Sequence, residues 1–186
     1  MRKAKISKQI IVDTAVLLAD RDGFYNITLK DIAEYLEIKT PSLYNHIDGM
    51  GELYDSMAQE GLKQLLSALT ESVIGFSGRD ALTSMGAAYI RFATSAPSLY
   101  YAAQRVPIWK NEATKELAES VVGLIIKLIA VYEFTEEQNI HIVRALRSYL
   151  HGFALLKSQD SFGMPVDIDR SFELGFMGLL DGLQLY

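Results

Sequence analysis

The sequence predicts an all-α protein with about nine helices, and three observations support that prediction. Alternation of apolar and polar residues, which is typical of strands, is nearly absent from the 186 residues. Apolar residues recur instead at helical spacing, as Ile11, Ala15 and Leu18 do. Capping residues, prolines and glycines divide this pattern into segments. The predicted helices span residues 7–21, 28–36, 41–47, 51–74, 80–94, 97–104, 111–132, 135–157 and 168–183.

Local chemistry sets the boundaries of these helices. Gly23 follows the first helix and is a typical C-terminal stop. Thr28 is placed as the N-cap of the second helix, and Asp31, three residues later, completes a capping box. Pro41 suits the first position of the third helix, where an N–H group would have no intrahelical partner. Thr135 opens another capping box before the eighth helix.

Composition limits the class of protein. Apolar residues make up 49% of the chain, which is enough for a core without disulfides, and no cysteine is present. The basic start of the chain is not followed by the uninterrupted apolar segment of a signal peptide. No apolar run approaches the roughly 20 residues that a membrane span needs. We therefore expect a cytoplasmic protein with no membrane partner.

Charge is distributed unevenly along the chain. The formal net charge is −5, although residues 1–50 carry seven basic and seven acidic residues and are therefore neutral. The excess of acidic residues lies entirely in residues 51–186. A basic run without an acidic residue opens the chain, namely Arg2, Lys3, Lys5 and Lys8. The N-terminal end is thus the end better suited to a polyanion.

The second and third predicted helices are separated by only residues 37–39, so their axes should cross sharply, as in a helix-turn-helix. The inward positions of this corner are apolar: Ile32, Ala33, Leu36, Ile38, Leu43 and Ile47. The outer positions carry hydrogen-bonding groups and a cation: Lys39, Thr40, Ser42, Tyr44 and Asn45. Such side chains suit base edges and phosphates. A small three-helix cap with a polar solvent face would show the same spacing.

Residues 7–60 resemble the DNA-binding domain of the tetracycline-repressor (TetR) family. The resemblance rests on residues 11–15 (IVDTA), 18 (L), 23–24 (GF), 28–33 (TLKDIA), 36–38 (LEI), 43–46 (LYNH) and 52–53 (EL). It implies that Lys30 contacts the DNA backbone or a base, that residues 40–42 contact bases, and that Tyr44 contacts a phosphate. His46 matches a histidine near the backbone, although a structural capping role is an equal alternative.

The predicted DNA-binding residues are therefore Lys5, Thr28, Lys30, Lys39, Thr40, Pro41, Ser42, Tyr44, Asn45 and His46. Three features depart from the family pattern. Glu37 stands in the turn where glycine is usual, and Met50 stands where a phosphate-binding lysine is usual. Ala19 and Ile47 replace aromatic residues, which implies a differently packed core. The basic run at the start of the chain is expected to compensate for the missing lysine.

The first three predicted helices are short and compact, whereas the later ones are longer and more apolar, which indicates a domain boundary near residue 50. The resemblance implies that residues 1–50 form a DNA-binding domain and residues 51–186 an effector-binding and dimerisation domain. Candidate residues for the effector cavity are Met85, Tyr89, Phe92, Tyr100, Tyr101, Trp109, Tyr149 and Phe153, with His151 as a polar anchor. Aromatic walls of this kind suit a flat, largely apolar ligand. For each of these residues the alternative is an ordinary core position, and for His151 it is a buried histidine with satisfied hydrogen bonds.

Small residues on the last two predicted helices suggest a close helix–helix seam between two copies of the chain. The glycines concerned are Gly152, Gly175, Gly178 and Gly182. Packing within one chain is the alternative. Residues 149–153 (YLHGF) also resemble a C-terminal subclass that is recognised by an aromatic-His-Gly (WHG) motif, with Tyr149 two positions before His151.

We therefore expect a DNA-binding transcriptional regulator, a repressor in the family's usual mode. It should bind a palindromic double-stranded operator as a homodimer and be released by a small effector. Catalysis is not expected, because His46, His141 and His151 form no HExxH pair and residues 75–78 (GFSG) lack the lysine of a phosphate-binding loop. Neither metal nor cofactor is expected. The alternative is a helical ligand-binding or adaptor protein with weak or lost DNA binding, which Met50 and the acidic net charge would favour.

Overall fold

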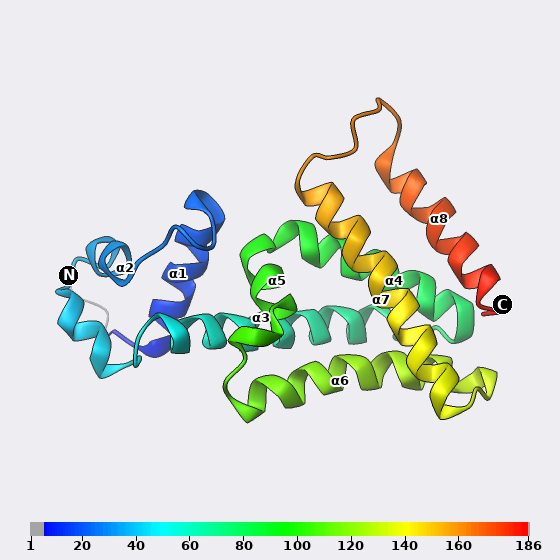
Figure 1. Ribbon diagram of the computed structural model, residues 1–186, viewed down its shortest axis with the longest axis horizontal. Helices are drawn as coiled ribbons and strands as arrows, with labels where there is room; N and C mark the ends of the chain where they lie inside the picture. Colours follow the sequence, from blue (N-terminus) through cyan, green and yellow to red (C-terminus); the bar gives the residue numbers. More distant parts are fainter. Residues whose placement is uncertain (1–5, 186) are drawn as a thin grey trace. The chain divides into compact units, whose positions relative to one another are not determined.

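The computed structural model describes residues 6–185, which form two compact units (Figure 1). The first unit consists of Met1–Lys63 and Ala96–Leu117, and the second of Gln64–Ser95 and Ala118–Tyr186. Lys5, one of the predicted DNA-binding residues, lies outside the described residues together with Arg2 and Lys3. The functional boundary near residue 50 stays a prediction, because the first unit also includes a later segment of the chain.

The all-α prediction is confirmed for the described part of the chain, where each of the nine predicted segments contains a helix. The α-helices are α1 (Lys8–Asp22), α2 (Leu29–Tyr35), α3 (Met50–Ser72), α4 (Gly78–Ser95), α5 (Pro97–Gln104), α6 (Glu112–Ile129), α7 (Glu136–Ser158) and α8 (Ile168–Gly182). Three 3₁₀ segments accompany them: η1 (Thr40–Asn45), η2 (Val106–Ile108) and η3 (Ala130–Tyr132). Residues 6–185 contain no strand. Within the same range, no helix combines the length and apolar character that crossing a membrane requires.

The third predicted helix differs from expectation in its winding. Its backbone bonds join residues three apart: the Ser42 N–H donates to the Lys39 carbonyl at 2.8 Å, and the His46 N–H donates to the Leu43 carbonyl at 2.9 Å. This tighter 3₁₀ pattern is typical of helical pieces of a few residues. The η1 segment is nevertheless the helix that the corner requires, since it follows α2 after a short turn.

The core of the first unit confirms the predicted inward positions. Ile11, Ala15 and Leu18 on α1 are buried. Four residues of the predicted corner are also buried, Ile32, Ala33, Leu43 and Ile47. Leu36 and Ile38 are partly buried against the same cluster. Three short helices that share one apolar cluster explain why the corner holds its shape.

Residues distant in sequence complete the first unit. The Asp20 carboxylate of α1 accepts a hydrogen bond from the Ser98 N–H at the start of α5, at 3.0 Å. Gly61 of α3 lies against α5 so closely that an added Cβ would be 2.3 Å from the Leu99 carbonyl oxygen. Asp55 of α3, which is buried, accepts a hydrogen bond from the Lys110 N–H at 2.8 Å. The segment that includes α5 and η2 is therefore fixed to α1 and α3 within the first unit.

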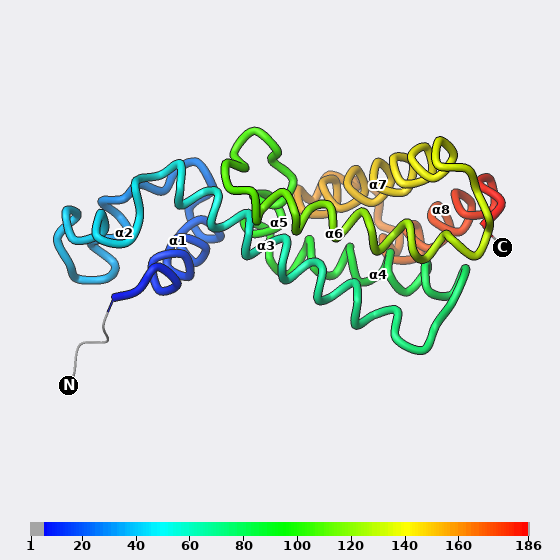
Figure 2. Tube along the Cα trace, turned by 90° about the horizontal axis from the view of Figure 1, so that it is seen from below, coloured from blue at the N-terminus to red at the C-terminus, as the bar shows by residue number. Residues whose placement is uncertain are grey.

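The second unit is built around α4, which contacts both α7 and α8. After residues 159–167, α8 returns beside α7, as both views show (Figures 1 and 2). Gly86 of α4 allows the Phe176 ring of α8 to lie against the α4 backbone, since an added Cβ would be 2.5 Å from Phe176 Cε1. Phe176 is consequently one of the largest fully buried side chains of the molecule.

Candidate functional site

The turn between α2 and η1 closes the predicted corner with two backbone hydrogen bonds. The Glu37 N–H donates to the Glu34 carbonyl at 3.1 Å, and the Ile38 N–H donates to the Ala33 carbonyl at 2.9 Å. Glu37 has a φ of 53°, which is the left-handed region that favours glycine. The departure from the family's glycine therefore falls on the one residue of this turn whose backbone conformation a side chain disfavours.

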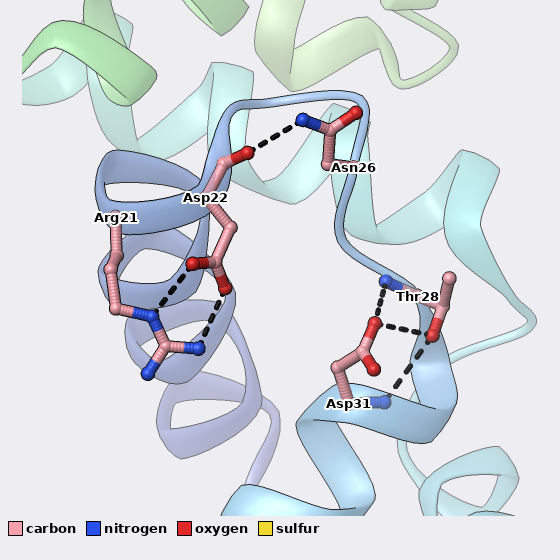
Figure 3. Close-up of polar contacts among 5 residues, drawn as sticks. All are labelled: Arg21, Asp22, Asn26, Thr28 and Asp31. Atoms are coloured by element: carbon pink, nitrogen blue, oxygen red, sulfur yellow. Dashed lines mark hydrogen bonds and ion pairs between the residues drawn. The ribbon is translucent and has the colours of Figure 1, made fainter.

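The predicted capping box at the start of α2 is confirmed (Figure 3). Thr28 Oγ1 accepts a hydrogen bond from the Asp31 N–H at 3.3 Å, while Asp31 Oδ2 accepts from the Thr28 N–H at 2.9 Å and from the Thr28 hydroxyl at 2.6 Å. These hydrogen bonds from Thr28 lower the pKa of the Asp31 carboxyl. Thr28 is exposed on the proposed DNA-facing side, but its hydroxyl is already engaged in the hydrogen bonds of the cap.

The other predicted contact residues on this corner share one property: their side chains face solvent wholly or in part. Lys30, Lys39, Pro41, Tyr44 and Asn45 are exposed, and Thr40, Ser42 and His46 are half-buried. Tyr44 is 56% exposed, although it is a large aromatic residue. Within residues 6–185, the polar side chains of this set have no hydrogen bond or ion pair. The corner therefore presents hydrogen-bonding capacity that the described part of the chain does not use.

Two ion pairs lie beside the corner. Arg21 and Asp22 form an ion pair of 2.6 Å at the end of α1 (Figure 3). Lys8 Nζ lies 2.6 Å from Glu52 Oε1, and this hydrogen bond, with one from the Asp48 N–H, lowers the pKa of the Glu52 carboxyl. Lys8, the one residue of the basic run that the structure describes, therefore links α1 to α3.

A cation lies near the start of α3, although Met50 stands at the position where the family usually has a lysine. Met50 is half-buried and packs against the core of the first unit. At the next residue, Gly51, an added Cβ would be 2.9 Å from Lys110 Nζ. Lys110 is exposed, and its ammonium has no ion-pair partner within the described residues. Sequence reasoning missed Lys110, because only the folded segment after η2 brings it to α3.

Six predicted effector residues lie in the second unit. Met85, Tyr89 and Phe92 of α4 are buried, whereas the three residues from α7, Tyr149, His151 and Phe153, are half-buried. Tyr149 donates a hydrogen bond from its hydroxyl to the Phe172 carbonyl at 3.0 Å, and burial raises its pKa. Burial, followed by the charge of Arg147, lowers the pKa of His151 and favours its neutral form.

Tyr100, Tyr101 and Trp109 belong to the first unit, where they have contacts of their own. The Tyr101 hydroxyl is hydrogen-bonded with the Tyr25 hydroxyl at 3.4 Å and accepts from Arg105 Nη1 at 2.8 Å. These hydrogen bonds, that with Tyr25 first, lower the pKa of Tyr101. Trp109 Nε1 donates to the Ala102 carbonyl at 3.4 Å. The nine candidates are thus divided between two clusters.

A cavity of about 650 Å³ lies between α4 and α8, and none of the predicted effector residues lines it. Its wall consists of Thr83, Ala87, Ile90, Arg91, Thr94, Lys157, Asp169, Arg170, Phe172, Glu173, Leu174, Phe176 and Met177. The predicted residues nevertheless contact the lining: Tyr149, whose hydroxyl bonds to the Phe172 carbonyl, lies 5.9 Å from Phe172 and 5.7 Å from Phe176 between ring centroids.

The four glycines of the predicted seam have different surroundings. Gly175 accommodates Tyr149 of the same chain, because an added Cβ would be 2.3 Å from the Tyr149 hydroxyl oxygen. Gly152, Gly178 and Gly182 have open space where a Cβ would lie. Apolar side chains on the same two helices are exposed, namely Leu155, Leu156, Leu174 and Met177. Gly175 therefore serves packing within the chain, and the other three remain candidates for a seam.

Comparison with known proteins supports the resemblance of the sequence to a family of regulators. Residues 82–178, about half of the chain, match the family described as "Tetracyclin repressor-like, C-terminal domain". An uncharacterized HTH-type transcriptional regulator of Bacillus subtilis, YobS, is 32% identical over 179 residues, which are 96% of this chain and 93% of YobS. An uncharacterized HTH-type transcriptional regulator of Mycobacterium tuberculosis, Rv0681, is 30% identical over 90% of this chain and 76% of its own.

Among solved structures, a variant of TetR from Acinetobacter baumannii AYE in complex with minocycline has the same fold. Its TM-score is 0.73 at 21% identity, and the match covers 97% of each chain. The aromatic-His-Gly subclass stays a prediction. The matches of the family and of the two regulators establish that this chain belongs to the TetR family of helix-turn-helix transcriptional regulators.

Proposed function

We propose that this regulator is a repressor that binds a palindromic DNA operator as a homodimer and is released by a small molecule. One observation above all supports the proposal: the polar side chains on the outer face of the α2–η1 corner are unpaired, whereas two ion pairs beside the corner, Lys8–Glu52 and Arg21–Asp22, are formed within the chain. A surface of this kind is suited to many hydrogen bonds with one extended partner. Because the partner is operator DNA, we place the protein in the cytoplasm.

The outer face divides by chemistry into base and phosphate contacts. Thr40, Ser42 and Asn45 carry the short donors and acceptors that suit base edges in the major groove. Lys30 and Lys39 supply charge for the backbone, and Tyr44 supplies a phenol that can donate to a phosphate. Lys110, beside Gly51 at the start of α3, is a further cation for the backbone. Lys110 would thereby supply the phosphate contact that the uncharged Met50 cannot make.

The dimer is proposed to form through α7 and α8. Gly178 and Gly182 of α8 and Gly152 of α7 are open, so the backbone of a second copy could approach closely there. Leu155 and Leu156 of α7 are exposed and would be covered in such a dimer. The two corners of a dimer must then lie about 34 Å apart to enter successive major grooves.

The effector is proposed to bind in the second unit. The TetR structure named above contains minocycline, an observation that concerns that protein. In this chain, an effector would release DNA by binding better to the conformation that does not fit the operator, so that the population shifts away from the DNA-bound form. The rings of Phe172 and Phe176 on α8, which line the cavity, provide an apolar wall for a molecule of this kind.

Selection of genomic fragments with the purified protein, followed by mobility-shift titrations at several salt concentrations, tests the proposal. A palindromic site is expected, and Tyr44→Ala and Lys30→Ala should each weaken binding to it. If Lys30 contacts one phosphate in each half-site, Lys30→Ala should reduce the slope of log K against log salt by about 2 per dimer. Lys63→Ala removes an exposed lysine of α3 and is the control. Unchanged affinity in both Tyr44→Ala and Lys30→Ala would show that the corner is not the DNA-contacting surface, whereas the absence of any salt-dependent DNA binding would favour a ligand-binding protein without operator function.

A further inference from the structure

The cavity between α4 and α8 has the size and shape of a small-molecule site. Its volume of about 650 Å³ lies within the range of roughly 300–1,000 Å³ that is usual for ligand pockets. It is lined from three helices, since Lys157 of α7 joins the residues of α4 and α8. All of them belong to the second unit, so the cavity is complete within one compact part of the chain.

The floor of the cavity is apolar and firmly packed. Ile90, Phe172 and Phe176 are buried in the second unit and line it. The rings of Phe172 and Phe176 are stacked, with centroids 5.3 Å apart and an angle of 14° between their planes. Phe176 is fixed further by its close approach to Gly86. The floor therefore offers a preformed apolar surface that needs little rearrangement to receive a hydrocarbon or aromatic body.

The rim of the cavity is charged, and its charges are unequally paired. Lys157 forms an ion pair with Asp169. Arg170 Nη1 lies 3.0 Å from Glu173 Oε2. Arg91, the remaining charged residue of the lining, is exposed, and its guanidinium has no ion pair or hydrogen bond within residues 6–185. The lining thus carries one positive charge in excess, which belongs to the unpaired guanidinium of Arg91.

The two threonines of the lining do not offer competing donors. The Thr83 hydroxyl donates to the Arg79 carbonyl at 2.9 Å, and the Thr94 hydroxyl donates to the Ile90 carbonyl at 3.0 Å. Each is a bond within the same helix, so the one proton of each hydroxyl is already engaged. Polar recognition in the cavity therefore depends on Arg91.

We propose that this cavity binds an amphipathic organic anion, namely a carboxylate on a hydrocarbon or aromatic body. The guanidinium of Arg91 would bind the carboxylate through paired N–H donors, which fit its two oxygens. The apolar body would lie on Phe172 and Phe176. A small molecule fits these features better than a second copy of the chain. The cavity is concave, and a single anionic group would neutralise the one positive charge in excess on its rim.

Binding at this cavity also has a covalent route to the first unit. Arg91 and Thr94 lie in the last turns of α4, and the chain continues through Pro97 directly into α5. The first turn of α5 is held by the Asp20 carboxylate of α1 through the Ser98 N–H. A ligand that changes the position of the end of α4 therefore acts on a segment tied to α1. This coupling, unlike the binding itself, rests on the proposed function.

Calorimetric titration of the purified full-length protein, without DNA, tests the binding step. The probes are decanoate and 2-naphthoate, with decanol as the uncharged control. We expect saturable binding of at least one anion with one site per chain, and binding of decanol weaker by at least about tenfold, because a charge-assisted hydrogen bond is lost. Saturable binding of neither anion would overturn the proposal, and so would equal affinity for decanoate and decanol.

Matched variants locate the site. Arg91→Gln should weaken anion binding at least about tenfold, and Ala87→Phe should abolish it by filling the cavity. Arg144→Gln, which removes an exposed arginine of α7 outside the cavity, should leave the affinity unchanged. Thermal melting of each variant checks its fold, and Arg91→Gln, an exposed substitution, decides the question if Ala87→Phe fails to fold. Unchanged affinity in Arg91→Gln contradicts the proposal. A change of oligomeric state in Ala87→Phe with no effect on anion binding does so too, since a second copy would then cover the cavity.

Operator release separates this inference from the proposed function. If the protein binds its operator and the anion binds without releasing it, the cavity is a ligand site that is not coupled to DNA. If the protein binds the anion but no DNA, the proposed function fails and the site stands. If another compound releases the operator while neither anion binds, the effector site lies elsewhere and the inference fails.

Discussion

The outer face of the α2–η1 corner and the rim of the α4–α8 cavity use charged and polar side chains in opposite ways. On the corner, Lys30, Lys39 and Tyr44 have no internal hydrogen-bond or ion-pair partner within the described residues. On the rim, Lys157 and Arg170 are neutralised by acidic neighbours, and one arginine remains. Many unpaired groups suit a long polyanion such as DNA, whereas one unpaired charge over an apolar floor suits a small anion.

The surfaces differ equally in what supports them. The outer face of the corner is a thin layer of side chains over a three-helix core, so the exposed residues of this face can be replaced with little effect on stability. The cavity is part of the core of the second unit, because Phe172 and Phe176 are both floor and buried core. Mutations should therefore separate binding from stability at the corner and couple them at the cavity.

Phe176→Ala should show this difference most strongly. The ring is 1% exposed, and its removal should lower the free energy of unfolding by about 3–5 kcal/mol. Tyr44→Ala, at a 56% exposed tyrosine, should change the same quantity by no more than about 0.5 kcal/mol while weakening operator binding. Urea unfolding followed by circular dichroism measures both. Equal destabilisation by the two substitutions would show that the corner is also structural.

Alanine substitutions at two glycines would compare how tightly each unit is packed. In Gly61→Ala the new methyl would meet a backbone carbonyl of α5, which cannot move without its helix. In Gly86→Ala it would meet the buried ring of Phe176, a side chain that can yield slightly without movement of the α8 backbone. Alanine gains about 1 kcal/mol of helix propensity in either case. We expect a net loss of about 2–3 kcal/mol for Gly61→Ala and of about 1 kcal/mol or less for Gly86→Ala.

Thermal and urea unfolding of both glycine variants measure the difference. Gly123→Ala is the control, because nothing lies within 4 Å of its added Cβ and only helix propensity should act. Equal losses in Gly61→Ala and Gly86→Ala would mean that α8 is held as rigidly against α4 as α5 is held against α3.

The same contrast explains how much of the molecule the sequence could predict. The corner depends on residues that are neighbours in the chain: a capping box at Thr28, a three-residue turn and apolar positions at helical spacing. Each of these acts over one or two turns, so the pattern predicts the structure. The 3₁₀ winding of η1 was not predicted, since the same residues and caps would suit a short α-helix.

The cavity and the cation beside Gly51 could not be predicted, because they arise between residues far apart in the chain. Arg91 and Phe172 come from different helices, and the periodicity of a helix indicates a buried face without naming the helix that covers it. Aromatic residues such as Tyr101 and Trp109 were candidates by residue type alone, which does not assign them to a compact unit. Likewise, the glycine spacing of α8 did not reveal that Gly175 packs against Tyr149 of the same chain.

The capping box of α2 should contribute a pH-dependent part of the corner's stability. Thr28→Ala should lower the free energy of unfolding by about 1 kcal/mol, because the first turn of α2 loses its cap. The pKa of Asp31 is lowered in the folded state by its bonds with Thr28, so its carboxylate stabilises the fold above the unfolded pKa of about 3.9. That contribution should be lost as the pH falls through the folded pKa of Asp31.

Unfolding of Asp31→Asn and of the parent protein between pH 7 and pH 3 measures this dependence. The gap in stability between them should be constant near neutrality and shrink below about pH 4. Glu34→Gln, an exposed substitution on the same helix, is the control. A gap that widens on acidification would show that the carboxylate destabilises α2.

The smallest expected effects come from two glutamates that share a left-handed backbone, Glu37 in the corner with a φ of 53° and Glu133 after η3 with a φ of 54°. Glycine adopts this conformation without the Cβ penalty, although it also makes the unfolded chain more flexible. Glu37→Gly and Glu133→Gly should therefore each raise the free energy of unfolding by about 0.5–1 kcal/mol. Glu34→Gly, at a right-handed position inside α2, should lower it by about 1 kcal/mol and is the control.

Since Glu37 adjoins the proposed DNA-facing side, its loss should also strengthen operator binding at low salt, whereas Glu133→Gly should not. Destabilisation by Glu37→Gly would mean that its side chain has a role in the turn that outweighs the backbone.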